Sequence, residues 1–179
     1  AGSTSLAQIY GTLAAGQLAV GEVGQSLLTP LAFVMILAGI GFKIAAVPFH
    51  FYAPDVYQGT TSLNAGILAV FPKIAGMVAL MRLILVMSPV LGFWSWQTVM
   101  LLSLLTMTLG NVAALWQTNI RRLLAYSSIA HTGYMLMGLV VALFSSRDVS
   151  ADEGFSAMLL YLVVYAIASI GTFAALGWL

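Results

Sequence analysis

The sequence contains no cysteine and very little charge. Of its 179 residues only 6% are charged, and the basic and acidic side chains nearly balance at a formal net charge of +1. The absence of cysteine excludes disulfides, thiolate nucleophiles and cysteine-ligated iron–sulfur clusters within this chain. A net charge so close to zero gives no indication of nucleic-acid binding.

Hydrophobic residues make up 61% of the chain, and they gather in long runs. Soluble domains carry roughly 25% charged residues, and several runs here reach the ~20 residues that a helix needs to cross a bilayer. The composition therefore predicts an all-α membrane protein whose helices contact the lipid bilayer. A soluble protein with buried helices is the less favoured interpretation.

Five transmembrane helices are expected, at about residues 30–47, 62–86, 96–116, 123–144 and 155–179. Residues 1–28, rich in Gly, Ser, Ala and Gln, are expected to form an extramembrane connection with a short helix after Ser3 or Ser5. Residues 29–179 then form a transmembrane bundle. The chain starts without methionine and its last apolar run continues to Leu179, so we interpret it as an internal part of a longer polytopic protein.

Pro48 is expected to interrupt the first span. Proline lacks the backbone N–H and clashes with the preceding turn, so the helix should break or kink there and resume within FHFYAPDVYQ. Lys43 would then lie about one turn before the break. Asp55, which follows Pro54, fits a turn or helix cap. His50 is either a relay group or a structural partner.

Two lysines, Lys43 and Lys73, lie in the middle of otherwise apolar spans. A charged amine at that depth is costly and is usually functional, and burial can bring the pKa of a lysine toward neutrality. These two residues are therefore candidates for groups that take up and release protons. The alternative, in which the side chain reaches the membrane interface, is disfavoured by their central positions.

His131 lies on a polar stripe of its helix. Ser127 and Ser128 precede it by one turn and Tyr134 follows it, so the four side chains share one face. This stripe could hold water between Lys73 and His131, which we expect to face the same interhelical space. A helix-packing face is the alternative. Asn111 is interpreted as a contact between helices, and the remaining Met and aromatic residues as packing or lipid-facing groups. No metal-ligand cluster or cofactor-binding motif is apparent.

Basic residues give a weak indication of orientation. Alternating loops place Arg121 and Arg122 on the same side as the APDVYQG loop, and Arg147 on the other side with most of the acidic residues. The positive-inside rule then places the APDVYQG and QTNIRR loops in the cytoplasm.

Three motifs occur in order: GFKIAAVPFHFYAPDVYQG, then PKIAG, then QTNIRRLLAYSSIAHTGYMLMGL. Together they resemble the antiporter-like membrane subunits of respiratory complex I, and PDVYQG more narrowly resembles the N-type subunits of bacterial NADH–quinone oxidoreductase. The resemblance implies a fourteen-helix fold of which this chain supplies helices seven to eleven. It also implies that Lys43, Lys73 and His131 transfer protons. A glutamate paired with the helix-seven lysine is expected before Ala1, and a helix-twelve lysine after Leu179.

The function implied by the resemblance is that of a non-redox, proton-translocating membrane subunit of NADH–quinone oxidoreductase in the inner membrane of a bacterium. The other membrane subunits of complex I are then partners, and FMN, iron–sulfur clusters and quinone are expected in partner subunits. One alternative is a subunit of a multisubunit cation/proton antiporter or membrane-bound hydrogenase. A small-solute secondary transporter is less favoured, and a purely structural spacer would not need mid-membrane lysines.

Overall fold

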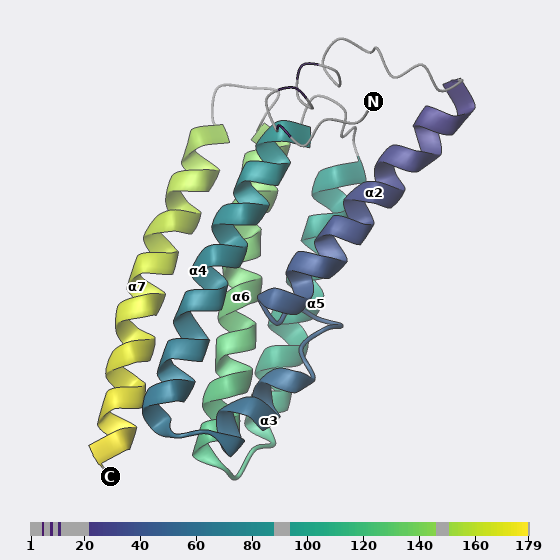
Figure 1. Ribbon diagram of the computed structural model, residues 1–179. Coiled ribbons are helices and arrows are strands. Elements are labelled where there is room, and N and C mark those ends of the chain that lie inside the picture. The colour runs from purple at the N-terminus through teal and green to yellow at the C-terminus, as the bar shows by residue number, and fades with distance from the viewer. Residues whose placement is uncertain are drawn as a thin grey trace.

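The computed structural model describes residues 5, 8 and 11 and the ranges 22–87, 94–145 and 151–178, and these are helical apart from short turns. The helices are α2 (Glu22–Lys43), α3 (Tyr52–Gly59), α4 (Ser62–Met87), α5 (Trp94–Leu115), α6 (Ile120–Ser145) and α7 (Ala151–Trp178). In Figure 1 the helices α4 to α7 run along one another, α2 leans against them and ends at mid-height, and α3 continues below it.

The all-α membrane fold is confirmed, because α4, α5, α6 and α7 are each long and apolar enough to cross a bilayer. They match the predicted second to fifth spans closely. The apolar part of α2, Pro30–Lys43, is shorter than a full span. This helix begins at Glu22, so residues 22–28 of the predicted connection are helical. The predicted short helix near Ser3 or Ser5 lies largely outside the described residues, as do residues 88–93 and 146–150.

Small residues allow α5 and α6 to approach closely. A Cβ atom added at Gly110 would lie 2.7 Å from the backbone nitrogen of Ala130, and one added at Gly133 would lie 2.7 Å from that of Met107. Neither position admits a side chain without a backbone shift. Close approach of this kind is a common mode of helix association in membranes, where apolar burial between helices supplies little driving force. Among the four spans, α6 is the most buried.

The first span ends at Lys43, before the expected end near Val47, and Lys43 itself is the last helical residue. Ala45 has a left-handed backbone with φ of 57°. Its N–H donates to the Phe42 carbonyl at 3.2 Å, while the Ala46 N–H donates to the Gly41 carbonyl at 2.8 Å. These two bonds form a Schellman motif, which terminates a helix.

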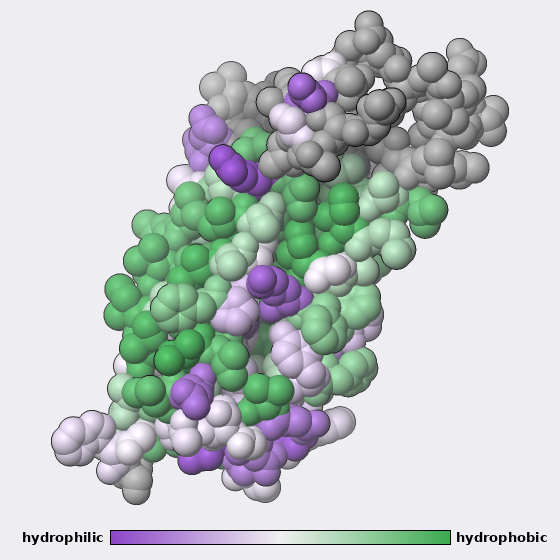
Figure 2. Space-filling view, viewed as in Figure 1, coloured by the Kyte–Doolittle hydropathy of each residue, from purple (hydrophilic) through white to green (hydrophobic). Residues whose placement is uncertain are grey.

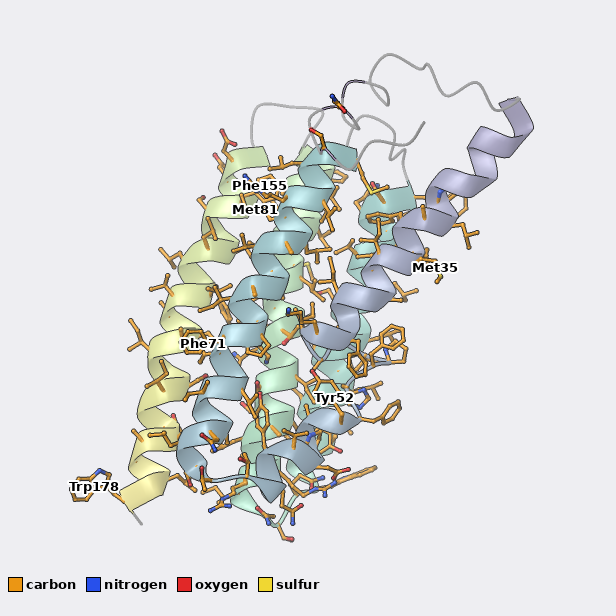
Figure 3. All side chains as sticks on the ribbon, viewed as in Figure 1. Met35, Tyr52, Phe71, Met81, Phe155 and Trp178 are labelled. Atoms are coloured by element: carbon orange, nitrogen blue, oxygen red, sulfur yellow. The ribbon has the colours of Figure 1, made fainter. Side chains whose placement is uncertain are left out.

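Pro48 lies beyond this motif, where the chain has already left the helix, and helical structure resumes at Tyr52. The predicted break is therefore confirmed, but its start is set by the Schellman motif rather than by the proline. Figure 3 shows Tyr52 at the junction of α2 and α3, where its hydroxyl donates to the Phe42 carbonyl at 2.9 Å.

Two threonine hydroxyls bond to backbone groups that the break sets free. On α5, Thr106 Oγ1 accepts the N–H of Val47 at 3.2 Å. On α6, Thr132 Oγ1 donates to the carbonyl of Ile44 at 3.2 Å. Both threonines are fully buried. An unsatisfied backbone group in a bilayer costs several kcal/mol, so these hydroxyls allow the chain to leave the helix at mid-bundle.

Two arginines hold α3 and the following loop against the start of α6. Arg122 forms an ion pair with Asp55 at 2.9 Å and also donates to the side chain of Gln58. Arg121 donates to the carbonyl of Thr60 at 3.1 Å. The loop at Gly59 therefore lies on the same side as Arg121, as predicted. The assignment of that side to the cytoplasm stays a prediction.

Apolar side chains cover most of the outer face of the long helices. Figure 2 shows a surface that is largely green along the long helices. Hydrophilic residues lie near α3, at the opposite end of the bundle, and at mid-height where α2 ends in Figure 1. Lys43, the last residue of α2, is exposed. Trp178 extends away from the end of α7 in Figure 3 and is 94% exposed. An apolar surface of this extent is typical of helices that face lipid or other membrane helices.

The left-handed backbone at Ala45 predicts that Ala45→Gly stabilises the fold. A Cβ atom costs roughly 1–2 kcal/mol in this conformation, and glycine removes that cost. The midpoint of thermal unfolding in detergent should therefore rise. Ala46→Gly is the matched control, because both alanines are buried but only Ala45 has a left-handed backbone, so Ala46→Gly should lower the midpoint. A lower midpoint for Ala45→Gly would contradict the proposed role of this residue in ending the helix.

Candidate functional site

Lys73 is buried in the middle of α4, with only 3% of its surface exposed. Its amine donates to two oxygens of one residue on α6, the backbone carbonyl and the hydroxyl of Ser128. It also donates to the hydroxyl of Tyr165 on α7 at 3.3 Å. An ammonium group carries three N–H donors, so each of them has an acceptor. The site thus replaces the hydration that the charged amine loses on burial.

Tyr165 is the centre of this site. Its hydroxyl lies 2.6 Å from Ser128 Oγ and donates to the carbonyl of Ala69, one turn before Lys73, at 3.3 Å. The amine of Lys73 lies 4.9 Å from the centre of the Tyr165 ring, within the range of a cation–π contact. Tyr57 of α3 is also buried close by, in one apolar cluster with Ala69. Four helices therefore contribute to the surroundings of one amine.

His131 lies next to this cluster. Its Nδ1 atom is 2.7 Å from the hydroxyl of Tyr161, one turn before Tyr165 on α7. The centres of the His131 and Tyr165 rings are 5.4 Å apart. Lys73 and His131 therefore both contact Tyr165 and face the same interhelical space, as the sequence predicts. Whether protons pass between them stays a prediction.

A groove between α6 and α7 is lined by His131 and by Ser128 and Tyr165, the two residues that bond to the Lys73 amine. It has a volume of about 210 Å³, and its polar lining is formed by Ser127, Ser128, His131, Tyr161, Tyr165, Ser169 and Thr172. Liquid water occupies about 30 Å³ per molecule, so the groove has room for several waters. Its hydroxyls and imidazole supply the two to four polar partners that each ordered water needs. The groove can therefore connect the Lys73 cluster to His131 through water.

The structure places Lys43 apart from this cluster. Its side chain is exposed at the end of α2, and among the described residues its amine has no ion pair or hydrogen bond. The next residue, Ile44, packs directly against Gly76 on α4, one turn beyond Lys73. The helix break beside one lysine therefore contacts the helix that carries the other, although the two amines do not meet.

The remaining predicted site residues occupy the edges of the site. The His50 ring packs against Phe51 and Tyr126, at centre-to-centre distances of 4.5 and 6.5 Å. Asp55 forms the surface ion pair with Arg122. These contacts hold α3 in place and do not reach the Lys73 cluster.

Tyr134 of the predicted polar stripe points toward α5. Its hydroxyl accepts from the Asn111 side chain at 3.0 Å, and its ring centre lies 5.9 Å from that of His131. The stripe is therefore divided: Ser128 contacts Lys73, Ser127 lines the groove and Tyr134 extends toward α5. Within the described ranges, no group of three or more His, Cys, Asp or Glu residues is placed to hold a metal ion.

The interpretation of all aromatic residues as packing or lipid-facing groups is wrong for Tyr161 and Tyr165. Their hydroxyls contact His131 and Lys73. They are spaced four residues apart in the otherwise apolar run YLVVY and therefore share one helix face. That spacing could have indicated a polar site, because two tyrosines on one buried face of a helix usually need polar partners for their hydroxyls.

Comparison with known proteins agrees with this architecture. The family model described as the transmembrane region of NADH:quinone oxidoreductase/Mrp antiporter matches residues 1–179. The chain is 46% identical over 145 residues to NADH-quinone oxidoreductase subunit N of Heliobacterium modesticaldum, which covers 80% of this chain and 29% of that protein. It is 40% identical over 186 residues to subunit N of an Anaeromyxobacter species, covering 96% and 34%.

A solved structure shows the same fold. A chain of respiratory complex I from Thermus thermophilus, determined with bound aureothin, aligns with a TM-score of 0.67 at 36% identity, over 96% of this chain and 37% of that chain. The chain thus spans about a third of the length of the relatives that it matches.

The contact between His131 and Tyr161 predicts a spectroscopic change in Tyr161→Phe. The variant removes the only hydroxyl bonded to His131 Nδ1 among the described residues, so the tautomer and the ¹⁵N shifts of that imidazole should change. The chain has two histidines, which makes solid-state NMR of ¹⁵N-histidine-labelled chain in bilayers practical. Tyr134→Phe is the control, because its hydroxyl bonds to Asn111 instead. Identical spectra for Tyr161→Phe and the unmodified chain would contradict the contact.

Proposed function

The chain belongs to the NADH:quinone oxidoreductase/Mrp antiporter transmembrane family, and we propose that it forms part of a proton-translocating membrane subunit of NADH–quinone oxidoreductase in a bacterial inner membrane. The observation that carries this proposal is the buried amine of Lys73, which is hydrogen-bonded to Ser128 and Tyr165, two residues that line a groove between α6 and α7. Its relatives among the N subunits support the choice of this enzyme.

The amine of Lys73 is the proton carrier in this proposal. In its charged form it fills three acceptor positions, on Ser128 and Tyr165. When it releases a proton, the hydroxyl of Ser128 or Tyr165 can rotate and donate to the neutral nitrogen, because a hydroxyl both donates and accepts. Both protonation states of the lysine are thereby hydrogen-bonded within the same site.

The α6–α7 groove is the proton route away from Lys73. Water in the groove would link the hydroxyls of Ser128 and Tyr165 to His131, whose Nδ1 atom is hydrogen-bonded to Tyr161. An imidazole can accept a proton at one nitrogen and release it from the other. His131 therefore serves as the next carrier after Lys73.

Lys43 is proposed as a second carrier, whose partner lies outside this chain. Its amine is exposed at the helix break and is unpaired among the described residues. Coupled titration of neighbouring charged groups would pass a change of charge from such a partner to Lys43 and onward to Lys73.

NADH oxidation and quinone reduction are assigned to partner subunits, together with FMN, the iron–sulfur clusters and the quinone site. This chain has no cysteine to ligate a cluster. A subunit of a cation/proton antiporter is the second candidate, since the matching family includes such antiporters. Proton pumping driven by NADH oxidation would support the oxidoreductase subunit, whereas proton movement driven by a sodium gradient would support the antiporter.

We expect Lys73→Met in the full-length protein to reduce NADH-driven proton pumping by roughly tenfold or more. Methionine has a similar length but carries no proton. Pumping would be measured by acidification of inverted membrane vesicles in which the complex is fully assembled. Arg82→Met is the matched control, because it removes an exposed cation from the same helix and should leave pumping unchanged. Normal pumping by Lys73→Met would refute the proposed role.

We also expect Lys43→Ala to reduce pumping without preventing assembly, because the residue is exposed at the break and makes no side-chain hydrogen bond or ion pair in the described residues. Lys43→Arg should be impaired as well, since a guanidinium group keeps its proton at all relevant pH values. The same vesicle assay, normalised to the amount of assembled complex, measures both. If Lys43→Arg pumped as fast as the wild type, Lys43 would act as a fixed charge and not as a carrier.

A further inference from the structure

Thr132 connects the two lysine sites. Its hydroxyl lies between two carbonyl oxygens, 3.1 Å from that of Ser128 and 3.2 Å from that of Ile44. The Ser128 carbonyl also accepts from the amine of Lys73, and Ile44 directly follows Lys43 at the helix break. Thr132 is fully buried, so water does not compete for these bonds.

The hydroxyl has a single hydrogen for these two acceptors. A carbonyl oxygen has two lone pairs, and in the α6 helix that of Ser128 already accepts the backbone N–H four residues later. The amine of Lys73 occupies the second position. With both lone pairs of the Ser128 carbonyl engaged, the carbonyl of Ile44, at 3.2 Å, is the favoured acceptor for the hydrogen of Thr132.

We propose that Thr132 is a positioning residue that couples the protonation of Lys73 to the conformation of the helix break beside Lys43. This inference rests on the proposed function. When Lys73 releases its proton, its nitrogen reorients to accept from the Ser128 or Tyr165 hydroxyl and leaves the Ser128 carbonyl. The Thr132 hydroxyl then turns back to that carbonyl. The carbonyl of Ile44 then loses its bond, and the break is held less tightly.

The packing around Ile44 supports this coupling. Its side chain presses directly against Gly76, one turn beyond Lys73 on α4. The backbone of the break is also held on its other side by the bond from the Val47 N–H to Thr106. Losing the bond at the Ile44 carbonyl therefore removes one of the two threonine bonds that fix this segment. Ile44 is also the residue next to Lys43.

The first test is amide hydrogen exchange of residues 44–51, measured by mass spectrometry on the assembled complex. Thr132→Val keeps the shape of the side chain but removes the hydroxyl, and should speed exchange of this segment about threefold or more. Thr132→Ser keeps the hydroxyl and should restore slow exchange. Thr98→Val is the matched control, because Thr98 makes the same bond to its own helix, to the carbonyl of Trp94, far from the break.

The deciding variant is Lys73→Met. Without the amine, the Thr132 hydroxyl is free to return to Ser128, so exchange of residues 44–51 should rise as in Thr132→Val. Unchanged exchange in Lys73→Met would overturn the coupling and leave Thr132 as a structural bond only. If Lys73→Met does not assemble, the pH dependence of the pumping rate decides. Thr132→Val should shift the pH at which pumping is half-maximal, and Thr132→Ser should return it to the wild-type value. A loss of pumping by the same factor at every pH would overturn the proposal. Normal pumping by Lys73→Met would refute the proposed function itself, which is a different result.

Discussion

The helix break after Lys43 is the constraint on which the rest of the structure depends. A chain that leaves its helix within a membrane sets free backbone groups that lipid cannot satisfy. Here Thr106 and Thr132 supply the missing bonds from α5 and α6. Both helices must therefore lie close to the break and to each other, and the glycines at 110 and 133 make that approach possible.

The position of α6 then decides the surroundings of Lys73. Once Thr132 is fixed at the break, Ser128 lies one turn earlier on the same helix face, where both of its oxygens reach the amine of Lys73. The tyrosines of α7 complete the site from the opposite side. A single set of contacts thus keeps the helix broken, solvates a buried charge and leaves a groove with several hydroxyl groups beside it. The proposed proton transfer would use all three features.

Part of this arrangement could be predicted from the sequence. The central lysines, the interruption at Pro48 and the polar face of His131 each have local signals, and three motifs indicated the family. The start of the break could not be predicted, because it depends on the left-handed backbone of an alanine, a residue with no preference for that conformation. The roles of Tyr161 and Tyr165 were missed because tyrosine is common at membrane interfaces, and only the rotation of α7 directs these hydroxyls inward.

The sequence by itself determined that the chain crosses a membrane, where its spans lie and which titratable groups are forced into the apolar layer, since each follows from hydropathy and residue type along the chain. The tertiary structure alone decided which of these groups meet. It joined Lys73 to Ser128 and Tyr165, separated Lys43 from them, and placed the Thr132 hydroxyl between the two sites. The reason is that hydrogen bonds between helices depend on their rotation and separation, which packing sets and local sequence patterns do not encode.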